Sequence, residues 1–328
     1  MKISKKLILA YTLLIIFFLF SLLNGRYSLS VQNIINIIFN NEQSMSSNIF
    51  YNIRLVRCVE VVLCGMALAI AGFLYQSSLH NDLASPDILG VSGGASIGAI
   101  ISILYFDDSI ILRQIFSFTG GIIAVIISLL ISKLITQNKK VSLLLSGVIC
   151  SAITNSIIMA FKYLADPTTQ LAVIDYWLMG SFSLINKSKL LGTLIIVLPC
   201  LLLVILFRYR LKALLLDEEE AKTLGVNTKA LYYFCVILST LLTASCVSVS
   251  GIISWIGLLA PHITKIIFRT SFEETLLLCM PIGGIILLLS DTLARTLTMS
   301  EIPISIFTSL IGAIFLFIFL INKNKKYD

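Results

Sequence analysis

Long apolar runs separated by short polar breaks dominate the chain. Ten such runs occupy residues 7–23, 56–79, 92–106, 114–135, 141–164, 190–207, 229–249, 252–268, 275–294 and 302–321. A helix needs about 20 apolar residues to cross the hydrocarbon of a bilayer. The pattern therefore predicts an all-α, polytopic membrane protein with about ten transmembrane helices. Glycine or proline interrupts the third and eighth runs, which are also short, so their ends are the least well defined.

Composition supports one membrane-embedded domain. Of 328 residues, 58% are hydrophobic and 12% are charged, which is far from the usual composition of a soluble domain. No linker or long polar block divides the chain, which predicts a single transmembrane domain over residues 1–328. The net charge of +7 would suggest nucleic-acid binding in a soluble protein. Here the basic residues stand at the ends of apolar runs and set orientation in membrane lipid, so no nucleic-acid partner is expected.

The N-terminal run has two readings. Lys2, Lys5 and Lys6 precede it, as in a secretory signal peptide. No small-x-small cleavage site follows at residues 22–26, so we predict an uncleaved first helix. Residues 30–40 then place four apolar side chains on one helical face, which predicts a helix lying in the membrane interface.

The distribution of basic residues predicts the orientation. Ten spans put both termini on one side, and placing that side in the cytoplasm puts twice as many of the 24 basic residues inside as outside. Cytoplasmic segments of membrane proteins carry such an excess. The expected location is the bacterial cytoplasmic membrane, with both termini cytoplasmic. The basic residues left outside are Arg26, Arg54, Arg57, Arg113, Lys162, Lys187, Lys189 and Arg295.

One strongly acidic segment, residues 217–226, interrupts the apolar pattern. Asp217 can cap the N-terminus of a short helix, and Glu220 stands at its third position as in a capping box. The carboxylates favour the positive end of the helix dipole, and Gly225 suits a helix stop. The predicted orientation places this helix in the cytoplasm, where it suits docking to a soluble partner. A plain solvent loop is the alternative.

Small residues cluster at the start of the third run. Pro86 and Gly90 break the preceding helix, and the residues that follow form a face almost without side chains. Such a face allows close approach of another membrane helix, and it also suits a helix that lines a wide translocation pathway. In the eighth run Pro261 removes a backbone donor, which predicts a kink or discontinuity. The residues assigned to the pathway or to helix packing are Ser92, Gly93, Gly94, Ala95, Ser96, Pro261 and His262.

The cysteines, the histidine at position 262 and the acid–arginine pairs are expected to have structural roles rather than catalytic or metal-binding ones. The seven cysteines lack metal-ligand spacing and lie in apolar runs, so they are expected to pack as small apolar residues, and no metal site is predicted. Of the two histidines, His262 is expected to be buried and hydrogen-bonded. Two acid–arginine pairs at helical spacing predict local ion pairs. They are Arg57 with Glu60 and Asp291 with Arg295.

The chain carries no recognisable nucleotide-binding motif. Its glycine cluster lacks the Gly-x4-Gly-Lys-Ser/Thr spacing of a P-loop, which occurs nowhere in the sequence. The chain is therefore expected to bind no cofactor itself. If ATP drives the protein, separate subunits bind and hydrolyse ATP-Mg.

Several short segments, taken in order and spacing, resemble a known family. They are Arg54-Leu55-Val56-Arg57, Leu83-Ala84-x-Pro86, Leu89-Gly90-Val91-Ser92-x-Gly94-Ala95, Trp177-Leu178-Met179-Gly180-Ser181, Glu218-Glu219-x-Ala221-x-x-Leu224-Gly225, Gly257-Leu258-x-x-Pro261-His262, Asp291-Thr292-Leu293-Ala294-Arg295 and Glu301-Ile302-Pro303. Together they resemble the permeases of iron-siderophore, haem and vitamin B12 ABC importers (FecCD type, type II importers). The resemblance covers nearly the whole chain, from Arg54 to Leu320.

The resemblance implies an architecture and a set of partners. Such permeases look like ten-helix subunits, as in the vitamin B12 permease, and pair around a central pathway as a homodimer or a paralogous heterodimer. Two cytoplasmic ATP-binding subunits would dock on a short coupling helix, and an extracellular substrate-binding lipoprotein would deliver the cargo. The coupling residues implied are Glu218, Glu219, Ala221, Leu224 and Gly225. The residues implied to dock the binding protein are Arg54, Arg57 and Arg295.

The sequence thus predicts the permease subunit of an ATP-binding cassette importer that is not itself an enzyme. The expected cargo is an iron chelate, foremost a ferric siderophore, with haem and cobalamin as alternatives. The rival prediction is an ion-gradient-driven secondary transporter, which would need carboxylates or histidines at mid-membrane. Ionisable residues here stand mostly near helix ends, which favours the importer. Neither a metal-ligand cluster nor a nucleophile–base pair supports an intramembrane enzyme.

Overall fold

Helices form every long element of the computed structural model, which describes residues 5–27, 31–40, 44–106, 109–135, 139–216, 218–223 and 225–324. The elements are α1 (Lys5–Leu23), α2 (Val31–Asn40), α3 (Met45–Asn48), η1 (Ile49–Arg54), α4 (Leu55–Leu79), η2 (Pro86–Leu89), α5 (Val91–Tyr105), α6 (Ile110–Leu134), α7 (Lys139–Leu164), α8 (Gln170–Leu178), α9 (Lys187–Leu211), η3 (Lys212–Leu215), α10 (Glu218–Thr223), α11 (Thr228–Ser250), α12 (Ile256–Phe268), α13 (Phe272–Thr296) and α14 (Ile304–Asn324). All ten predicted spans are helical, and the all-α, polytopic prediction is confirmed.

The helices differ in their capacity to span a bilayer. Seven helical stretches are long and apolar enough to cross, and α5, α12 and residues 304–318 of α14 are shorter apolar helices. With 15 and 13 residues, α5 and α12 extend about 22 and 20 Å, less than the roughly 30 Å of hydrocarbon. Backbone that is not α-helical precedes each of them: the short 3-10 helix η2 and Gly90 before α5, and residues 251–255 before α12. The predicted start of the eighth span at residue 252 is therefore wrong, because α12 begins at Ile256.

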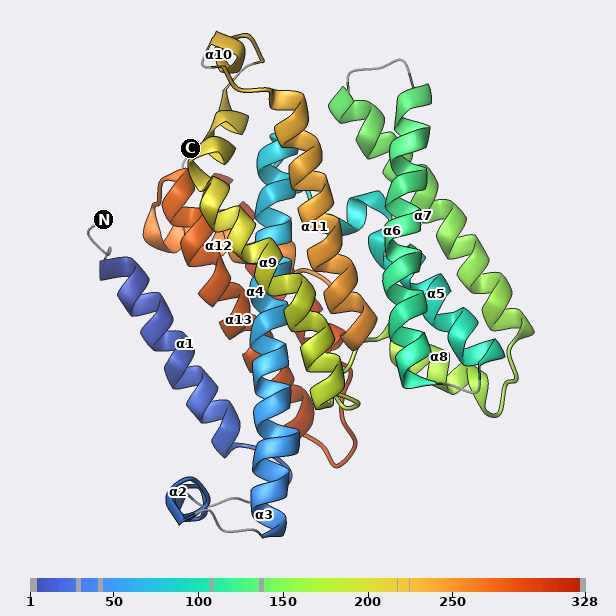
Figure 1. Ribbon diagram of the computed structural model, residues 1–328, viewed down its shortest axis with the longest axis vertical. Coiled ribbons are helices and arrows are strands. Elements are labelled where there is room, and N and C mark those ends of the chain that lie inside the picture. Colours follow the sequence, from blue (N-terminus) through green and yellow to red (C-terminus); the bar gives the residue numbers. More distant parts are fainter. Residues whose placement is uncertain are drawn as a thin grey trace.

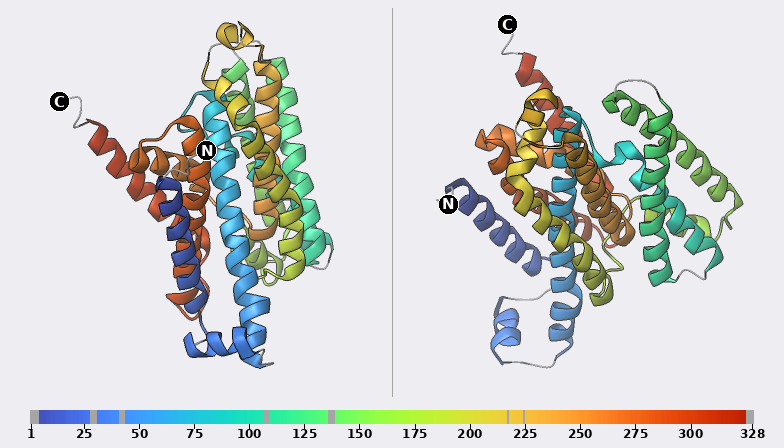
Figure 2. Two further views of the ribbon diagram at one scale, coloured as in Figure 1. Left: turned by 60° about the vertical axis from the view of Figure 1, so that its left-hand side comes forward. Right: turned by 45° about the horizontal axis from the view of Figure 1, so that its top comes forward.

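α4 occupies the centre of the bundle (Figure 1) and packs against α9, α11, α12 and α13. Helices α5 to α8 form a second group beyond α11, at the right of Figure 1, and α1 stands at the left edge. The two views in Figure 2 show α14, in red, diverging from the neighbouring helices toward its C-terminus. α10 lies at one end of the long axis and α3 at the other (Figure 1). We refer to these ends as the α10 end and the α3 end.

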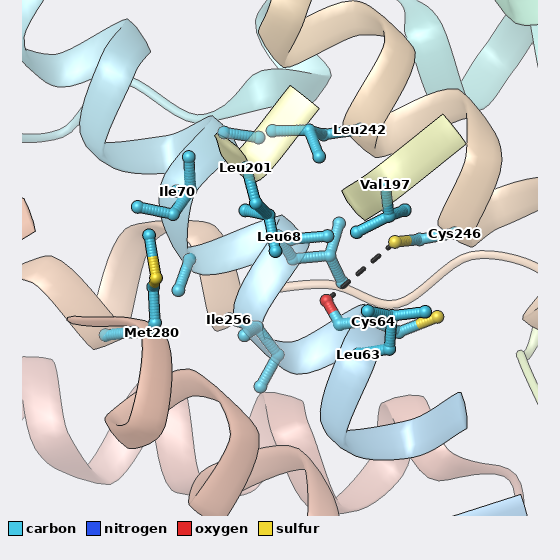
Figure 3. Close-up of a cluster of buried hydrophobic side chains, with 14 of the residues drawn as sticks. Leu63, Cys64, Leu68, Ile70, Val197, Leu201, Leu242, Cys246, Ile256 and Met280 are labelled. Atoms are coloured by element: carbon cyan, nitrogen blue, oxygen red, sulfur yellow. Dashed lines mark hydrogen bonds between the residues drawn. The ribbon is translucent and has the colours of Figure 1, made fainter. Parts of the chain in front are cut away.

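Apolar side chains of five helices meet around the middle of α4 (Figure 3). They include Leu68 and Ile70 of α4, Val197 and Leu201 of α9, Leu242 of α11, Ile256 of α12 and Met280 of α13. Two cysteines belong to the same core, where the Cys246 thiol donates to the carbonyl oxygen of Cys64 at 3.8 Å. All seven cysteines are buried and outside disulfides, which confirms the prediction that they act as packing residues.

Glycines bring the backbones of neighbouring helices together. A Cβ atom added to Gly72 on α4 would lie 1.8 Å from the carbonyl oxygen of Gly257 on α12. Within the group of helices α5 to α8, a Cβ on Gly98 of α5 would lie 1.9 Å from the carbonyl oxygen of Phe116 on α6. The helix axes can approach so closely only because side chains are missing at these points. The predicted packing face of α5 is thus confirmed.

α12 continues through Pro261, and a side chain from α4 bonds to the carbonyl that the proline leaves without its helical donor. Proline lacks the N–H that would bond the carbonyl four residues earlier, here that of Gly257. The side-chain amide of Gln76 donates instead to Gly257 O at 3.4 Å and to Leu258 O at 3.3 Å. The break in the span lies before α12 rather than at Pro261.

Candidate functional site

Three arginines from separate parts of the chain gather at the α3 end. Arg54 ends η1, Arg57 lies in the first turn of α4, and Arg295 lies in the last turn of α13. Their exposed fractions are 4%, 8% and 5%. The structure therefore brings the predicted docking residues together, but buries their guanidinium groups.

Two acids hold Arg57. Its Nε and Nη2 donate to Asp291 Oδ1 at 3.0 and 2.8 Å. Its Nη1 and Nη2 also donate to the two carboxylate oxygens of Glu301, at 2.9 and 3.1 Å. Asp291 in addition pairs with Arg295 at 3.4 Å, which confirms the predicted ion pair between positions four apart. The result is a buried network in which one carboxylate, Asp291, serves two arginines.

The other two arginines, Arg54 and Arg295, form hydrogen bonds at the C-terminus of α1. Arg54 donates to the carbonyl oxygens of Leu22 and Leu23 at 2.9 and 3.2 Å, and to that of Tyr27. Arg295 donates to the carbonyl and hydroxyl oxygens of Ser21 at 2.5 and 2.7 Å. The last carbonyls of a helix carry the negative end of its dipole, so cations are favourable there. These arginines thus fix α1 to η1 and α13.

The predicted Arg57–Glu60 ion pair is wrong. Glu60 is fully buried on α4 and accepts a hydrogen bond from the Thr193 hydroxyl of α9 at 2.7 Å. Arg57 is occupied by the acids of α13 and the following loop. A spacing of three residues permits contact on one helical face, but stronger tertiary partners draw the two side chains apart.

The acidic segment forms a short helix, α10, at the opposite end of the bundle (Figure 1). Gly225 has a φ of +72°, and the Val226 N–H bonds to the carbonyl of Ala221 at 3.0 Å. This left-handed glycine with a bond across the last turn is a usual helix stop, as predicted. Ala221 is buried and Glu220 is exposed.

Four predictions for this segment fall outside what the structure describes. Asp217 and Leu224 lie outside the described residues, and so do the side chains of Glu218 and Glu219. The assignment of α10 to ATPase coupling stays a prediction.

The residues assigned to the pathway or to packing lie inside the bundle. Ser92, Ala95 and Ser96 of α5 are buried, and Ser96 donates to the carbonyl of Ser92 at 2.7 Å. A Cβ on Gly93 would lie 2.4 Å from the Thr154 hydroxyl of α7, and one on Gly94 would lie 2.3 Å from the Gly120 carbonyl of α6. Pro261 and His262 are buried in α12, as expected for the histidine. Their packing is established, and their place on a translocation pathway stays a prediction.

A pocket of about 360 Å³ opens between α6, α8, α9 and α11. Its lining residues stand at the start of α6 and α9 and at the end of α11. Figure 1 shows these helix ends away from the α10 end. Its polar lining consists of Arg113, Tyr176, Ser181, Ser183, Lys189, Ser248 and Ser250. Arg113 and Lys189 are only 6% and 8% exposed. Two buried cations and a group of hydroxyls thus face one cavity.

The walls of this pocket are fixed by irregular backbone. Gly180 and Gly251 both have positive φ, and a Cβ on Gly251 would lie 2.1 Å from the Trp177 carbonyl. The Ser181 N–H donates to the Ser250 carbonyl at 2.7 Å, which ties the end of α8 to the end of α11. Non-helical backbone is tolerated at membrane depth when its polar groups are satisfied within the protein.

Asp166 organises the loop that leads into α8. Its carboxylate accepts bonds from the Thr168 hydroxyl and N–H at 2.6 and 2.7 Å, and from the Thr169 N–H at 3.3 Å. These bonds favour the charged form and lower the pKa of Asp166 below its usual value. The loop thereby positions the first turn of the helix that lines the pocket.

Comparison with known proteins identifies the family. The sequence profile of the FecCD transport family matches residues 13–323. The chain belongs to the FecCD transport family. The molybdate import system permease protein MolB of Haemophilus influenzae is 34% identical to this FecCD protein over 320 residues, covering 96% of the chain and 94% of MolB. A probable iron chelatin transport system permease protein of Helicobacter pylori is 33% identical over 297 residues, covering 90% and 89%.

A solved structure matches the FecCD fold over the whole length. It is described as an inward-facing conformation of a metal-chelate type ABC transporter. The TM-score is 0.87 at 33% identity, with 97% of this chain and 98% of that chain covered. The FecCD chain is therefore a multi-pass membrane protein, the permease subunit of an ABC importer, and not itself catalytic.

Sequence reasoning missed three contributors to these sites in the FecCD chain. Glu301 pairs with Arg57 across 244 positions, which no local spacing could reveal. Arg113 and Lys189 were noted only as basic residues on the outer side. Their position at the outer ends of two apolar runs was the available signal, but only the fold places both against one pocket.

Proposed function

We propose that this permease imports an iron chelate, foremost a ferric siderophore, across the bacterial cytoplasmic membrane. The observation that carries the proposal is that the two ends of the helix bundle differ in their chemistry. The exposed acidic helix α10 lies at one end, and the arginine network and the polar pocket lie toward the other. An ABC importer binds its cargo-delivering protein on the outer side and its ATPase subunits on the inner side, so it needs two different ends.

The α10 end would be cytoplasmic and would bind the ATPase subunits. α10 is short, ends at Gly225, contacts α11 and has one buried side chain, that of Ala221. A compact helix of this kind can transmit displacement to η3 and α11, which flank it in the chain. ATP-Mg would be bound and hydrolysed only by the partner subunits.

The α3 end would face outward and receive the binding protein. Arg54, Arg57 and Arg295 are assigned to this docking face, but their guanidinium groups already have partners within the subunit. Arg57 and Arg295 pair with acids, and Arg54 bonds to backbone carbonyls. A partner carboxylate could replace Glu301, whose side chain is 17% exposed, only if residues 297–303 moved. Charge complementarity would then steer docking more than it would add affinity. A second permease copy, identical or paralogous, would complete the pathway.

Transport assays test the cargo and the energy source together. The permease would be co-expressed with the ATPase and lipoprotein genes that neighbour its own, in cells lacking native iron-chelate uptake. We expect accumulation of radioactive iron from a ferric siderophore, and none when the ATPase carries an inactivating P-loop substitution. Uptake driven by an ion gradient without the ATPase would refute the proposal in favour of a secondary transporter.

A second candidate cargo is molybdate. It is favoured by the 34% identity to the Haemophilus influenzae molybdate permease over 96% of this chain. The same cells would be given radioactive molybdate in parallel with ferric siderophore, haem and cobalamin. Molybdate uptake without iron uptake would replace the iron-chelate proposal with this second candidate.

A further inference from the structure

We propose that the pocket between α6, α8, α9 and α11 binds an oxyanionic group, with Lys189 as its principal charge. The group would be a carboxylate of the chelate or a free tetrahedral oxyanion. This inference rests on the import function proposed above, because it assigns the pocket to the cargo. Its principal test does not depend on transport.

Lys189 provides the first argument. It lies in the first turn of α9, lines the pocket and is 8% exposed. Throughout the described ranges, its side chain forms no ion pair and no hydrogen bond. A buried ammonium group is unfavourable unless a counter-ion or hydrogen-bond acceptor meets it. The cavity in front of Lys189 is the space from which such an anion can approach.

The nearest carboxylate does not fill this role. Glu60 is buried beside α9, where its Oε1 accepts from the Thr193 hydroxyl at 2.7 Å and from the Cys64 thiol at 3.6 Å. Glu60 acts on Lys189 through a charge interaction, but it does not line the pocket and forms no ion pair with Lys189 among the described residues. The described lining contains two cations, Arg113 and Lys189, and no acid.

The rest of the lining suits an oxyanion. The hydroxyl of Tyr176 donates to Ser181 Oγ at 3.0 Å, and Ser181 Oγ donates to Ser183 Oγ at 3.0 Å. Hydroxyl groups in such a chain can rotate to donate toward an anion. The volume of about 360 Å³ is at the small end of ligand sites, so it fits an oxyanion or one arm of a chelate.

Trp177 makes the pocket measurable. It lines the cavity, and the chain has one other tryptophan, Trp255, which packs against Gly312 of α14. In a Trp255→Phe background, the fluorescence of Trp177 reports access of small quenchers in the full-length permease in lipid nanodiscs. Iodide is an anionic quencher and acrylamide is a neutral one, so their ratio at constant ionic strength measures the local preference for anions.

The expected effect of Lys189 is specific to charge. Lys189→Met should lower quenching by iodide roughly threefold to tenfold, from the loss of one nearby charge at intermediate dielectric, and leave quenching by acrylamide unchanged. Lys189→Arg should retain iodide quenching, and so should Lys187→Met, a matched change at an exposed lysine two residues away. If Trp255→Phe does not fold, the difference between the parent and Trp177→Phe gives the same signal.

Competition identifies the source of the oxyanion. Protection of Trp177 from iodide by molybdate assigns the pocket to a free oxyanion, and protection by ferric citrate alone assigns it to a chelate carboxylate. Equal iodide quenching in the parent and Lys189→Met, or protection by neither compound, would overturn the proposal. If transport fails while the quenching pattern holds, the proposed function falls and the anion site stands.

Discussion

Asp291 joins three helices through its contacts with two arginines. Its fully buried carboxylate accepts from Arg57 of α4 at 2.8 Å and pairs with Arg295 of its own helix at 3.4 Å. Arg295 in turn bonds to Ser21 at the end of α1. Together with Glu301, which pairs with Arg57, the shared carboxylate of Asp291 balances the charges of the two buried arginines.

The substitution Asp291→Asn should destabilise the permease severely. It preserves the shape of the side chain but leaves Arg57 with one acid and Arg295 with none among the contacts described. Breaking a buried pair by removing one partner typically costs about 3–5 kcal/mol. The loss would be measured as a lower temperature of unfolding of the purified permease in lipid nanodiscs.

Glu301→Gln is the matched control for Asp291→Asn. The Glu301 side chain is 17% exposed, and Arg57 keeps Asp291 when Glu301 is changed. Because Arg57 keeps one carboxylate and Glu301 has access to water, the loss should be smaller than for Asp291→Asn. An equal loss of stability in both variants would show that Asp291 is not the centre of the network.

Single residues also show what local sequence can reveal. The Asp291–Arg295 pair follows from a spacing of four, and it is present. The Arg57–Glu60 pair follows from a spacing of three, and it is absent, because Glu60 finds Thr193 133 positions away. Local spacing defines which side chains can meet, and the tertiary fold decides which of them do.

At the level of helices, the contact between α4 and α12 depends on two departures from regular structure. Pro261 leaves the Gly257 carbonyl without its usual helical donor, and Gln76 supplies a side-chain amide at 3.4 Å. Gly72 lets the backbone of α4 approach the same carbonyl. Each departure can be tested separately.

Gln76→Met should destabilise the permease by about 1–3 kcal/mol, because it leaves a buried carbonyl unsatisfied. In a Pro261→Ala background the backbone N–H of residue 261 becomes available to Gly257, so the same substitution should be less harmful. A double-mutant cycle on thermal unfolding measures the coupling, which we expect to be about 1 kcal/mol. Additive effects would mean that Gln76 does not compensate for Pro261.

Gly72→Ala should disrupt the α4–α12 contact. The added Cβ would lie 1.8 Å from a backbone oxygen that cannot rotate away, and overpacking of this kind costs about 1–3 kcal/mol or more. Gly192→Ala on α9 is the control, since its Cβ would meet only the flexible end of Gln114 at 3.2 Å. Helix propensity alone would make that control stabilising by up to about 1 kcal/mol. Similar stability of both variants would contradict the assigned close packing.

Helices were predictable where an apolar run is long. Their ends were less predictable where the backbone forms hydrogen bonds to distant segments in place of helical ones. α12 begins four residues after the predicted start, because the backbone of residues 250–252 bonds to other segments. The Ser250 carbonyl accepts from Ser181 N–H at 2.7 Å, and the Ile252 carbonyl accepts from the Ser305 hydroxyl at 2.7 Å. Partners so distant in sequence leave no local pattern. The end of α10 was predictable because glycine readily adopts the positive φ that Gly225 has there.

At the scale of the whole molecule, the sequence predicted a direction as well as a fold. The bias of basic residues predicts that α10 lies inside the cell, and the structure separates α10 from the arginine network along the long axis (Figure 1). The pocket also lies away from the α10 end. Cargo capture and coupling to ATP would then act at opposite ends, joined by the buried central helix α4.

Cysteine labelling in intact cells tests this direction with little background, because all seven native cysteines are buried. The Met299→Cys variant places a thiol at a fully exposed position between α13 and α14, next to the arginine network. It should react with a membrane-impermeant maleimide in intact cells. The Glu220→Cys variant on exposed α10 should react only after the membrane is permeabilised. Labelling of the Glu220→Cys variant in intact cells would reverse the orientation, and α10 could then no longer meet a cytoplasmic ATPase.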